Sequence, residues 1–112
     1  MKREAVLTGQ LDLLVLAVLA RRPAHGYAVL ESLRVKSGGL FDLPEGSLYP
    51  ALYRLEHQGL IVGEWGESEN KRKAKYYRLT AAGKRRLRAE AEKWNSMADV
   101  IAGVLDTTPE EV

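Results

Sequence analysis

The stretch that decides the fold is residues 46–61, which read GSLYPALYRLEHQGLI. Three leucines recur in it at the helical spacing of a buried stripe, and a glycine suited to a left-handed helix cap follows. The opposite face carries hydroxyls, aromatic edges and an arginine. Such a face suits insertion into a DNA major groove, although an ordinary solvent-exposed helix has the same pattern. The sequence therefore predicts one amphipathic helix over residues 44–58, buried through Leu48, Leu52 and Leu55.

Two strand-like segments follow this helix and are joined by a basic loop. Residues 61–65 and 75–79 are rich in aromatic and β-branched residues, a composition typical of the two strands of a hairpin. The loop between them contains Lys71, Arg72 and Lys73. A helix followed by a hairpin with a basic tip is the winged variant of the helix-turn-helix.

The charge is distributed unevenly along the chain. The formal net charge is only +2, but residues 71–88 contain nine of the 17 basic residues and none of the 15 acidic ones. The rest of the chain therefore has eight basic and 15 acidic residues, a net charge of −7. A local basic segment of this kind is expected for phosphate contacts. For residues 84–88 a solvated helix face explains the charge equally well, whereas the hairpin loop projects outward.

Composition excludes several classes of protein. The chain has no cysteine, which excludes disulfides, thiolate zinc sites and thiol catalysis. We expect neither a signal peptide nor a membrane helix, because no apolar run approaches the roughly 20 residues that a membrane span needs. The two histidines are far apart, and a glycine-rich phosphate loop is lacking. We therefore expect a single-domain cytoplasmic protein that is not an enzyme and that holds no metal or cofactor.

Two helices are predicted before residues 44–58. The first covers residues 9–20 and is apolar nearly all round, so we expect it to be buried on two sides, one of them against a second subunit. The second starts near residues 25–27 and ends before Ser37. Its inward-facing residues are expected to be Tyr27, Leu30 and Leu33.

A last helix begins at Thr80, a good N-cap residue, and continues to about residue 105. Apolar residues repeat along it at alternating spacings of four and three, the pattern of an intersubunit seam. The core helix of a monomer would show a wider stripe, and Met97 and Val104 do widen this one. The seam residues are Leu87, Ala91, Trp94, Ala98, Ile101 and Leu105.

The expected fold is thus α+β and mostly α. Residues 1–79 form a winged helix-turn-helix DNA-binding domain of three helices and a two-stranded wing. Residues 80–106 form a C-terminal dimerisation helix, and residues 107–112 form a flexible tail.

Several motifs resemble those of the PadR family of winged-helix transcriptional regulators, in particular its short members. Each motif is weak alone, but together, in order and at family spacing, they are highly specific. They extend from the first helix to the start of the last. The motifs are PAHGY at residues 23–27, GSLYP at 46–50, RLE at 54–56, GLI at 59–61 and KYYRLT at 75–80, with Gly83.

This resemblance implies a homodimer that binds palindromic operator DNA, usually as a repressor, and releases it on a signal. In short members the last helix and the partner's first helix form the dimer. Some of these members bind flat aromatic compounds there against a tryptophan, and Trp94 lies at the matching position. The sequence departs from the family at Ala28, where an acidic residue is frequent, which affects little beyond a local contact.

The residues expected to contact DNA come from the second helix, from the helix over residues 44–58, which would be the recognition helix, and from the wing. Tyr49, Pro50 and Tyr53 could instead pack between helices, and His25 could be a helix cap or a phosphate contact. Tyr27 is expected in the core with its hydroxyl at the phosphate surface. The full set is His25, Tyr27, Ser47, Tyr49, Pro50, Tyr53, Arg54, Lys71, Arg72, Lys73 and Lys75.

A ligand site is expected in the seam because the small side chains beside Trp94 leave room for a planar aromatic compound. The alternative is that Trp94 only fills the seam. The ligand-binding set is Leu11, Val15, Ala91, Trp94 and Ala98. The dimer set is Leu14, Val18, Leu87, Trp94, Ile101 and Leu105.

The sequence therefore predicts a ligand-responsive DNA-binding regulator with three kinds of partner. These are double-stranded operator DNA through residues 44–58 and the 66–75 wing, a second copy of the chain, and a small-molecule effector. The alternative is a winged-helix module that binds protein and never DNA.

Overall fold

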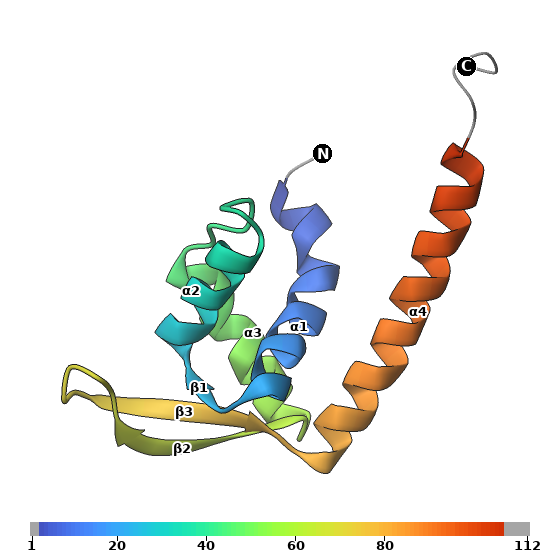
Figure 1. The fold of residues 1–112 in the computed structure, drawn as a ribbon. Coiled ribbons are helices and arrows are strands. Elements are labelled where there is room, and N and C mark those ends of the chain that lie inside the picture. Colours follow the sequence, from blue (N-terminus) through green and yellow to red (C-terminus); the bar gives the residue numbers. More distant parts are fainter. Residues whose placement is uncertain (1–2, 107–112) are drawn as a thin grey trace.

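The computed structural model describes residues 3–106 and, within them, the side chains from residue 10 onward. The tail expected over residues 107–112 lies outside the described residues. Figure 1 shows helices resting on one face of a small sheet, with a long helix at one side. The elements in order are α1 (Arg3–Arg21), β1 (Ala24–His25), α2 (Gly26–Lys36), α3 (Glu45–His57), β2 (Ile61–Glu67), β3 (Lys73–Leu79) and α4 (Ala81–Leu105).

The predicted two-stranded wing is confirmed, and a third strand that was not predicted extends it to a three-stranded sheet. β2 and β3 form the predicted antiparallel hairpin. β1 pairs with the other edge of β3, through Ala24 opposite Tyr77 and His25 opposite Tyr76, which gives the order β1-β3-β2. A strand of two residues is too short to show the alternating pattern by which strands are recognised in a sequence.

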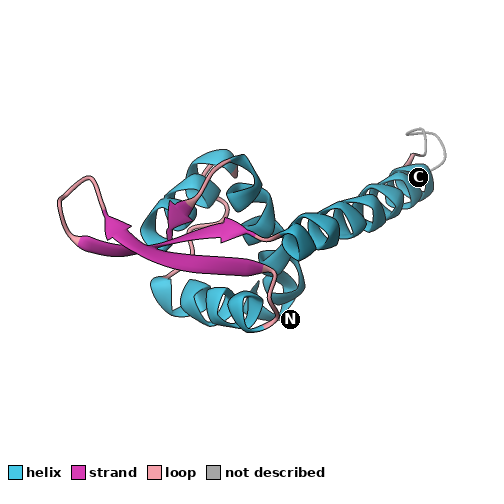
Figure 2. Cartoon of the chain, turned by 90° about the horizontal axis from the view of Figure 1, so that it is seen from below, coloured by secondary structure: helices cyan, strands magenta, loops and turns pink. Residues whose placement is uncertain are grey.

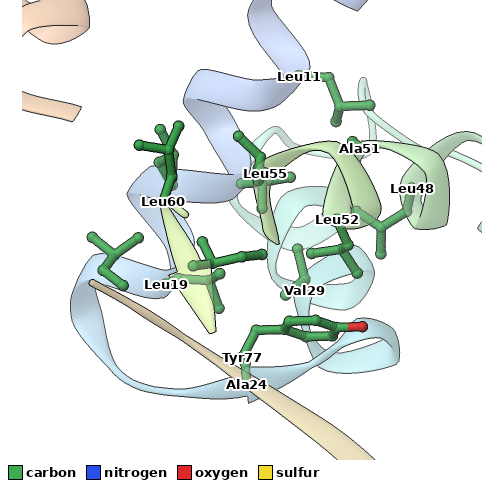
Figure 3. Close-up of a cluster of buried hydrophobic side chains, with 14 of the residues drawn as sticks. Leu11, Leu19, Ala24, Val29, Leu48, Ala51, Leu52, Leu55, Leu60 and Tyr77 are labelled. Atoms are coloured by element: carbon green, nitrogen blue, oxygen red, sulfur yellow. The ribbon is translucent and has the colours of Figure 1, made fainter. Parts of the chain in front are cut away.

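Buried aliphatic side chains from α1, α2, α3 and the sheet form one core (Figure 3). The predicted stripe of α3 is confirmed, since Leu48, Leu52 and Leu55 are at most 1% exposed. α2 contributes Val29 and Leu33, which are buried one turn apart. Leu30 is half-buried. These residues place the recognition helix on a rigid support.

The expectation that Tyr27 points inward is wrong. Its side chain is 63% exposed. The buried stripe of α2 runs through Gly26, Val29 and Leu33, at the spacings of three and four that define one helix face. Tyr27 lies about 100° away from that stripe, so it faces solvent beside the wing.

The end of α3 has the geometry predicted from Gly59. This glycine has a φ of +75°, in the left-handed region that favours glycine. The Leu60 N–H donates to the Leu55 carbonyl at 3.0 Å, and the Gly59 N–H donates to the Glu56 carbonyl at 3.0 Å. This pair of bonds is the Schellman cap, and Leu60 closes it by being buried. The cap turns the chain directly from the recognition helix into the wing.

α4 starts as predicted and then leaves the body of the domain. The Thr80 side chain accepts a hydrogen bond from the Gly83 N–H at 3.0 Å and caps the helix. Figures 1 and 2 show that the rest of α4 projects from the end of the sheet opposite the wing tip. The radius of gyration is 16.4 Å, whereas a compact chain of this length would have about 13 Å. No helix among residues 3–106 is long and apolar enough to span a membrane.

Candidate nucleic-acid interface

The outer face of α3 is an exposed aromatic and polar surface. Tyr49 is 45% exposed and Tyr53 70% exposed. Pro50 is also exposed, and Ser47 is half-buried. The rings of Tyr53 and His57 lie parallel, with centroids 6.1 Å apart. All four residues that sequence analysis assigned to this face for DNA contact therefore reach the surface of the recognition helix.

Arg54, the fifth residue assigned to α3, is held by an acidic partner. Its Nη2 donates to Oδ1 of Asp12 on α1 at 2.8 Å, and both side chains are partly exposed. Asp12 was not predicted as a partner of Arg54, because 42 positions separate the two residues and nothing in their local patterns links them. The ion pair fixes the direction of the guanidinium at the edge of the outer face of α3.

The tip of the wing carries three exposed basic residues: Lys71, Arg72 and Lys73. The loop is closed by a hydrogen bond from the Ser68 N–H to the Arg72 carbonyl at 2.8 Å. Lys71 has a φ of +58° within this turn. The Lys73 Nζ lies 5.2 Å from the centre of the Trp65 ring. The basic loop is thus closed by hydrogen bonds, and Figure 1 shows the hairpin that carries it extending beyond the helices.

Lys75 has a different role from the tip residues. Its Nζ donates to Oε1 of Glu56 on α3 at 3.1 Å, and the side chain is 31% exposed. The stem passes over Gly63, where an added Cβ would collide with Lys75. Lys75 therefore ties β3 of the wing to α3. The glycine in β2 is what gives its side chain room.

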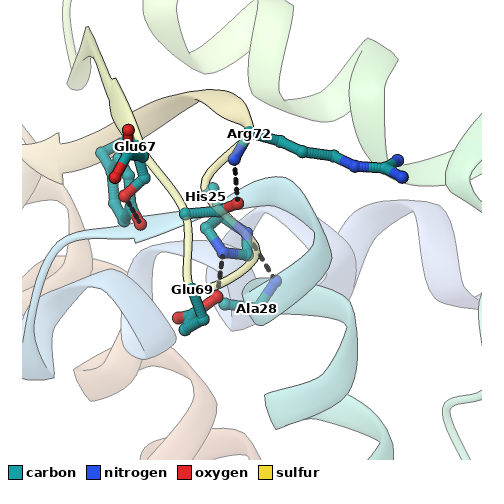
Figure 4. Close-up of polar contacts among 7 residues, drawn as sticks. His25, Ala28, Glu67, Glu69 and Arg72 are labelled. Carbon is teal, nitrogen blue, oxygen red and sulfur yellow. Dashed lines mark hydrogen bonds and ion pairs between the residues drawn. The ribbon is translucent and has the colours of Figure 1, made fainter.

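His25 caps α2 and also holds the wing loop. Its Nδ1 accepts a hydrogen bond from the Ala28 N–H at 3.1 Å, and its Nε2 lies 3.4 Å from Oε2 of Glu69 (Figure 4). Because Nδ1 is an acceptor, the proton is on Nε2, which donates to Glu69. A hydrogen bond from its own backbone N–H, followed by the contact with His25, lowers the pKa of Glu69. The cap interpretation of His25 is the one that this geometry supports.

Comparison with known proteins agrees with this architecture. The sequence profile described as the transcriptional regulator PadR-like family matches residues 15–89. The chain belongs to the PadR-like family of transcriptional regulators. The match covers the winged helix and the first turns of α4, which are the elements that carry the outer face of α3 and the basic wing.

Solved PadR-like structures and a further relative resemble most of this chain. A PadR-like regulator from Bacillus cereus is 27% identical, with a TM-score of 0.82 over 93% of this chain and 99% of that one. A PadR family regulator from Eggerthella lenta is 38% identical, with a TM-score of 0.76 over 93% and 88% of the two chains. Protein X of Lysinibacillus sphaericus is 28% identical over 90% of this chain and 93% of its own length.

In this PadR-like regulator the residues predicted to bind a ligand and those predicted to form the dimer interface include both buried and exposed side chains. Val15 is fully buried and Leu11 is 7% exposed, so both belong to the core of their own chain. Within this chain α1 packs against α2, α3, β3 and α4, and the assignment of these two residues to a ligand site stays a prediction. Half-buried positions are Leu14, Val18, Leu87, Ala91 and Ala98. The exposed members are Trp94 at 46%, Ile101 at 44% and Leu105 at 71%.

Proposed function

We propose that this PadR-like regulator is a homodimeric repressor that binds palindromic operator DNA through α3 and the wing. The observation that carries the proposal is that Tyr49 of α3 and Lys73 of the wing line one concave surface. A duplex lying there would meet the aromatic outer face of α3 in its major groove while the basic tip meets the phosphate backbone.

The division of contacts follows from side-chain chemistry. Arg54 and Ser47 can donate hydrogen bonds to base edges, which distinguish one sequence from another. Lys71, Arg72 and Lys73 are exposed on a loop. Their ammonium and guanidinium groups can contact phosphates, and such contacts do not depend on the base sequence. α3 would then set specificity, and the wing would contribute affinity that falls with added salt.

The apolar face of α4 supports the dimer. Large apolar residues along the projecting part of the helix are 44–72% exposed, and soluble monomers seldom leave such a patch uncovered. Two copies paired about a twofold axis would cover it and present two copies of α3, which explains a palindromic site. The residues are Trp94, Met97, Val100, Ile101, Val104 and Leu105.

We propose further that the same seam senses a small planar aromatic compound. Trp94 lies between two alanines, Ala91 and Ala98, which are half-buried and small. A second Trp94 related by twofold symmetry would lie nearby, leaving a slot of aromatic and apolar walls. A compound bound there would act on both copies at once, so it could change operator affinity.

The test is protection of the DNA upstream of the chain's own coding region. The purified full chain should protect two adjacent half-sites related by a dyad, and the affinity should fall steeply with added salt. Protection of a single half-site would contradict the dimer. Absence of salt-dependent DNA binding would instead favour a winged-helix module that binds protein.

A further inference from the structure

A cavity of about 370 Å³, called here the α1–α2 cavity, lies between the end of α1 and one face of α2. The chain turns through β1 from one helix into the other, and the two helices pack against each other (Figure 1). Among the residues that the structure describes, none from α3, α4 or the wing lines this cavity. It is therefore separate from the concave surface at Tyr49 and Lys73 and from the proposed seam.

One wall of the α1–α2 cavity is a single face of α2. Ala28, Ser32 and Lys36 line the cavity at intervals of four residues, so they lie along one side of the helix. Ala28 and Ser32 are half-buried. Because both side chains are short, they leave space between the two helices. Ser32 also brings a hydroxyl group to this space, and a hydroxyl can donate a hydrogen bond to an anion.

The opposite wall comes from the end of α1 and supplies two arginines. Val18 and Arg21 are three positions apart on α1, and Arg22 follows the helix directly. Residues three apart lie on the same face of a helix. Both arginines are exposed, as is Lys36 on the other wall. The packing of the two helices therefore brings three cations to one cavity.

The charge of the α1–α2 cavity favours a dianion. The described lining contains Arg21, Arg22 and Lys36 and no carboxylate. Arg21 and Lys36 are in the last turns of their helices, where each helix end contributes about half a negative charge. Even with both helix ends counted, a net charge of about +2 remains at the cavity. The two helix ends therefore do not neutralise the cations.

Neighbouring acidic residues do not neutralise these cations either. The next hollow along α2 shares two of the three cations and also contains Glu31 and Glu69. Glu31 is paired with Arg34, and Glu69 contacts His25. None of the three cations forms an ion pair with another side chain that the structure describes. Their positive charge is therefore available to a ligand.

We propose that the α1–α2 cavity binds the phosphate group of a small phosphorylated compound. A phosphate monoester carries a charge of about −1.5 to −2 at pH 7, which matches the charge of the lining. An arginine guanidinium can bind two phosphate oxygens at once, and the Ser32 hydroxyl can donate a further hydrogen bond. The volume is within the range of small-molecule sites, roughly 300–1,000 Å³. The rest of the compound would lie against Val18, Ala24 and Ala28.

The experiment titrates the full chain with glycerol 3-phosphate by isothermal titration calorimetry, in phosphate-free buffer at fixed ionic strength. We expect saturable binding of this probe and no binding of glycerol, which lacks the phosphate. Arg22→Gln should weaken probe binding about tenfold, the effect expected for loss of one charge-assisted contact. Arg88→Gln is the matched control, because it removes the same charge from an exposed position on α4 that does not line the cavity.

A second pair of variants adds a negative charge instead of removing a positive one. Ala28→Glu places a carboxylate among the three cations, so it should weaken probe binding at least tenfold. Ala89→Glu is the matched control, at an exposed position on α4 away from the cavity. Circular dichroism checks that each variant is folded. If Ala28→Glu does not fold, the comparison at the exposed Arg22 still decides the outcome.

The outcomes separate a built site from general attraction to positive charge. Saturable binding that Arg22→Gln weakens and Arg88→Gln does not weaken supports the proposal. Absence of saturable binding, or an equal loss in these two variants, would overturn it. DNA is another source of phosphate groups, so binding of a labelled random-sequence duplex is measured by fluorescence anisotropy. If the probe does not bind and Arg22→Gln alone weakens duplex binding, the cations contact the DNA backbone and the proposal is wrong.

Discussion

Arg54 on the recognition helix and Asp12 on α1 are joined by an ion pair whose Nη2 and Oδ1 atoms are 2.8 Å apart. Their side chains are 44% and 35% exposed, so solvent screens the pair and its contribution to folding is at most about 1 kcal/mol. The contact matters instead because it orients the Arg54 side chain. It holds one guanidinium at a defined place on the surface proposed to face the major groove.

The first prediction is that Asp12→Asn lowers discrimination between operator and random DNA. Arg54 loses the charge of the carboxylate that orients it, since the Asn oxygen is a weaker, neutral acceptor, and the surface loses one negative charge. Affinity for random DNA should therefore rise while the ratio of operator to random affinity falls, measured by fluorescence anisotropy at fixed salt. Asp99→Asn, which removes the same charge from an exposed position on α4, should leave the ratio unchanged. An unchanged ratio in Asp12→Asn would mean that Arg54 does not need this partner.

The second prediction distinguishes base contacts from phosphate contacts. Arg54→Ala should lose about 1–3 kcal/mol of preference for the operator. Lys73→Ala should weaken operator and random DNA about equally and reduce the salt slope by about one unit. Titrations at several salt concentrations would measure both quantities. An equal loss of preference in the two variants would show that the groove assignment is wrong.

The third prediction concerns the junction of the wing and α4. A Cβ added at Gly83 would collide with the Leu60 backbone carbonyl, and backbone cannot swing aside as a side chain can. Gly83→Ala should therefore lower the free energy of unfolding by about 1–3 kcal/mol or more. Gly103→Ala is the control in the same helix, since nothing lies within 4 Å of its added Cβ. It should stabilise the chain by about 0.5–1 kcal/mol. Urea unfolding would compare the stability of the two variants. Loss of stability in both would show that the collision with the Leu60 carbonyl is not the cause.

The fourth prediction is that Ile101→Glu gives a folded monomer or an unfolded chain, measured by sedimentation and circular dichroism. A carboxylate in the seam would be buried without a partner in each copy. Ser96→Glu adds the same charge to an exposed position outside the 4-and-3 seam and should remain a dimer. A stable dimer of Ile101→Glu would show that the seam is misassigned.

The fifth prediction makes Trp94 the reporter of the seam. In a Trp65→Phe background, a planar compound bound in the seam should quench Trp94 and change operator affinity by the same coupling factor. Ring stacking adds about 0.5–1.5 kcal/mol beyond buried area. Planar cationic and neutral dyes would be titrated with and without Trp94→Ala. Binding that survives Trp94→Ala would place the compound elsewhere, and no quenching by any dye would leave Trp94 as packing.

The parts of the fold that were predicted depend on short-range patterns. The leucine stripe of α3, the left-handed Gly59 and the Thr80 cap are each set by residues within about one or two turns. The start of α1 at Arg3 and the two-residue strand β1 were not predicted. β1 exists because Ala24 and His25 meet β3, more than 50 positions later, and no local pattern records that pairing.

In the candidate site, too, some features follow from short-range patterns and others from long-range packing. The exposure of Tyr49, Tyr53 and the wing-tip cations follows from helix and strand periodicity. Tyr27 was misplaced because two neighbouring stripes of α2 are apolar, and only the packing of α2 against α1 and α3 selects one. The partners of Arg54 and Lys75 are Asp12 and Glu56, on other elements. Such pairs depend on how elements pack in space, which a single sequence does not state.

The length of α4 has a mechanical consequence. The helix spans 25 residues, about 38 Å at 1.5 Å per residue, and it leaves the domain after its first turns. In a dimer joined through the C-terminal part of α4, each recognition helix lies at the far end of this long helix. A rotation of about 10° where the two α4 helices cross shifts each recognition helix by about 6 Å, nearly two base steps along DNA. A compound that repacks the seam only slightly would thus disengage both half-sites, because the arm multiplies a small change in angle into a large displacement.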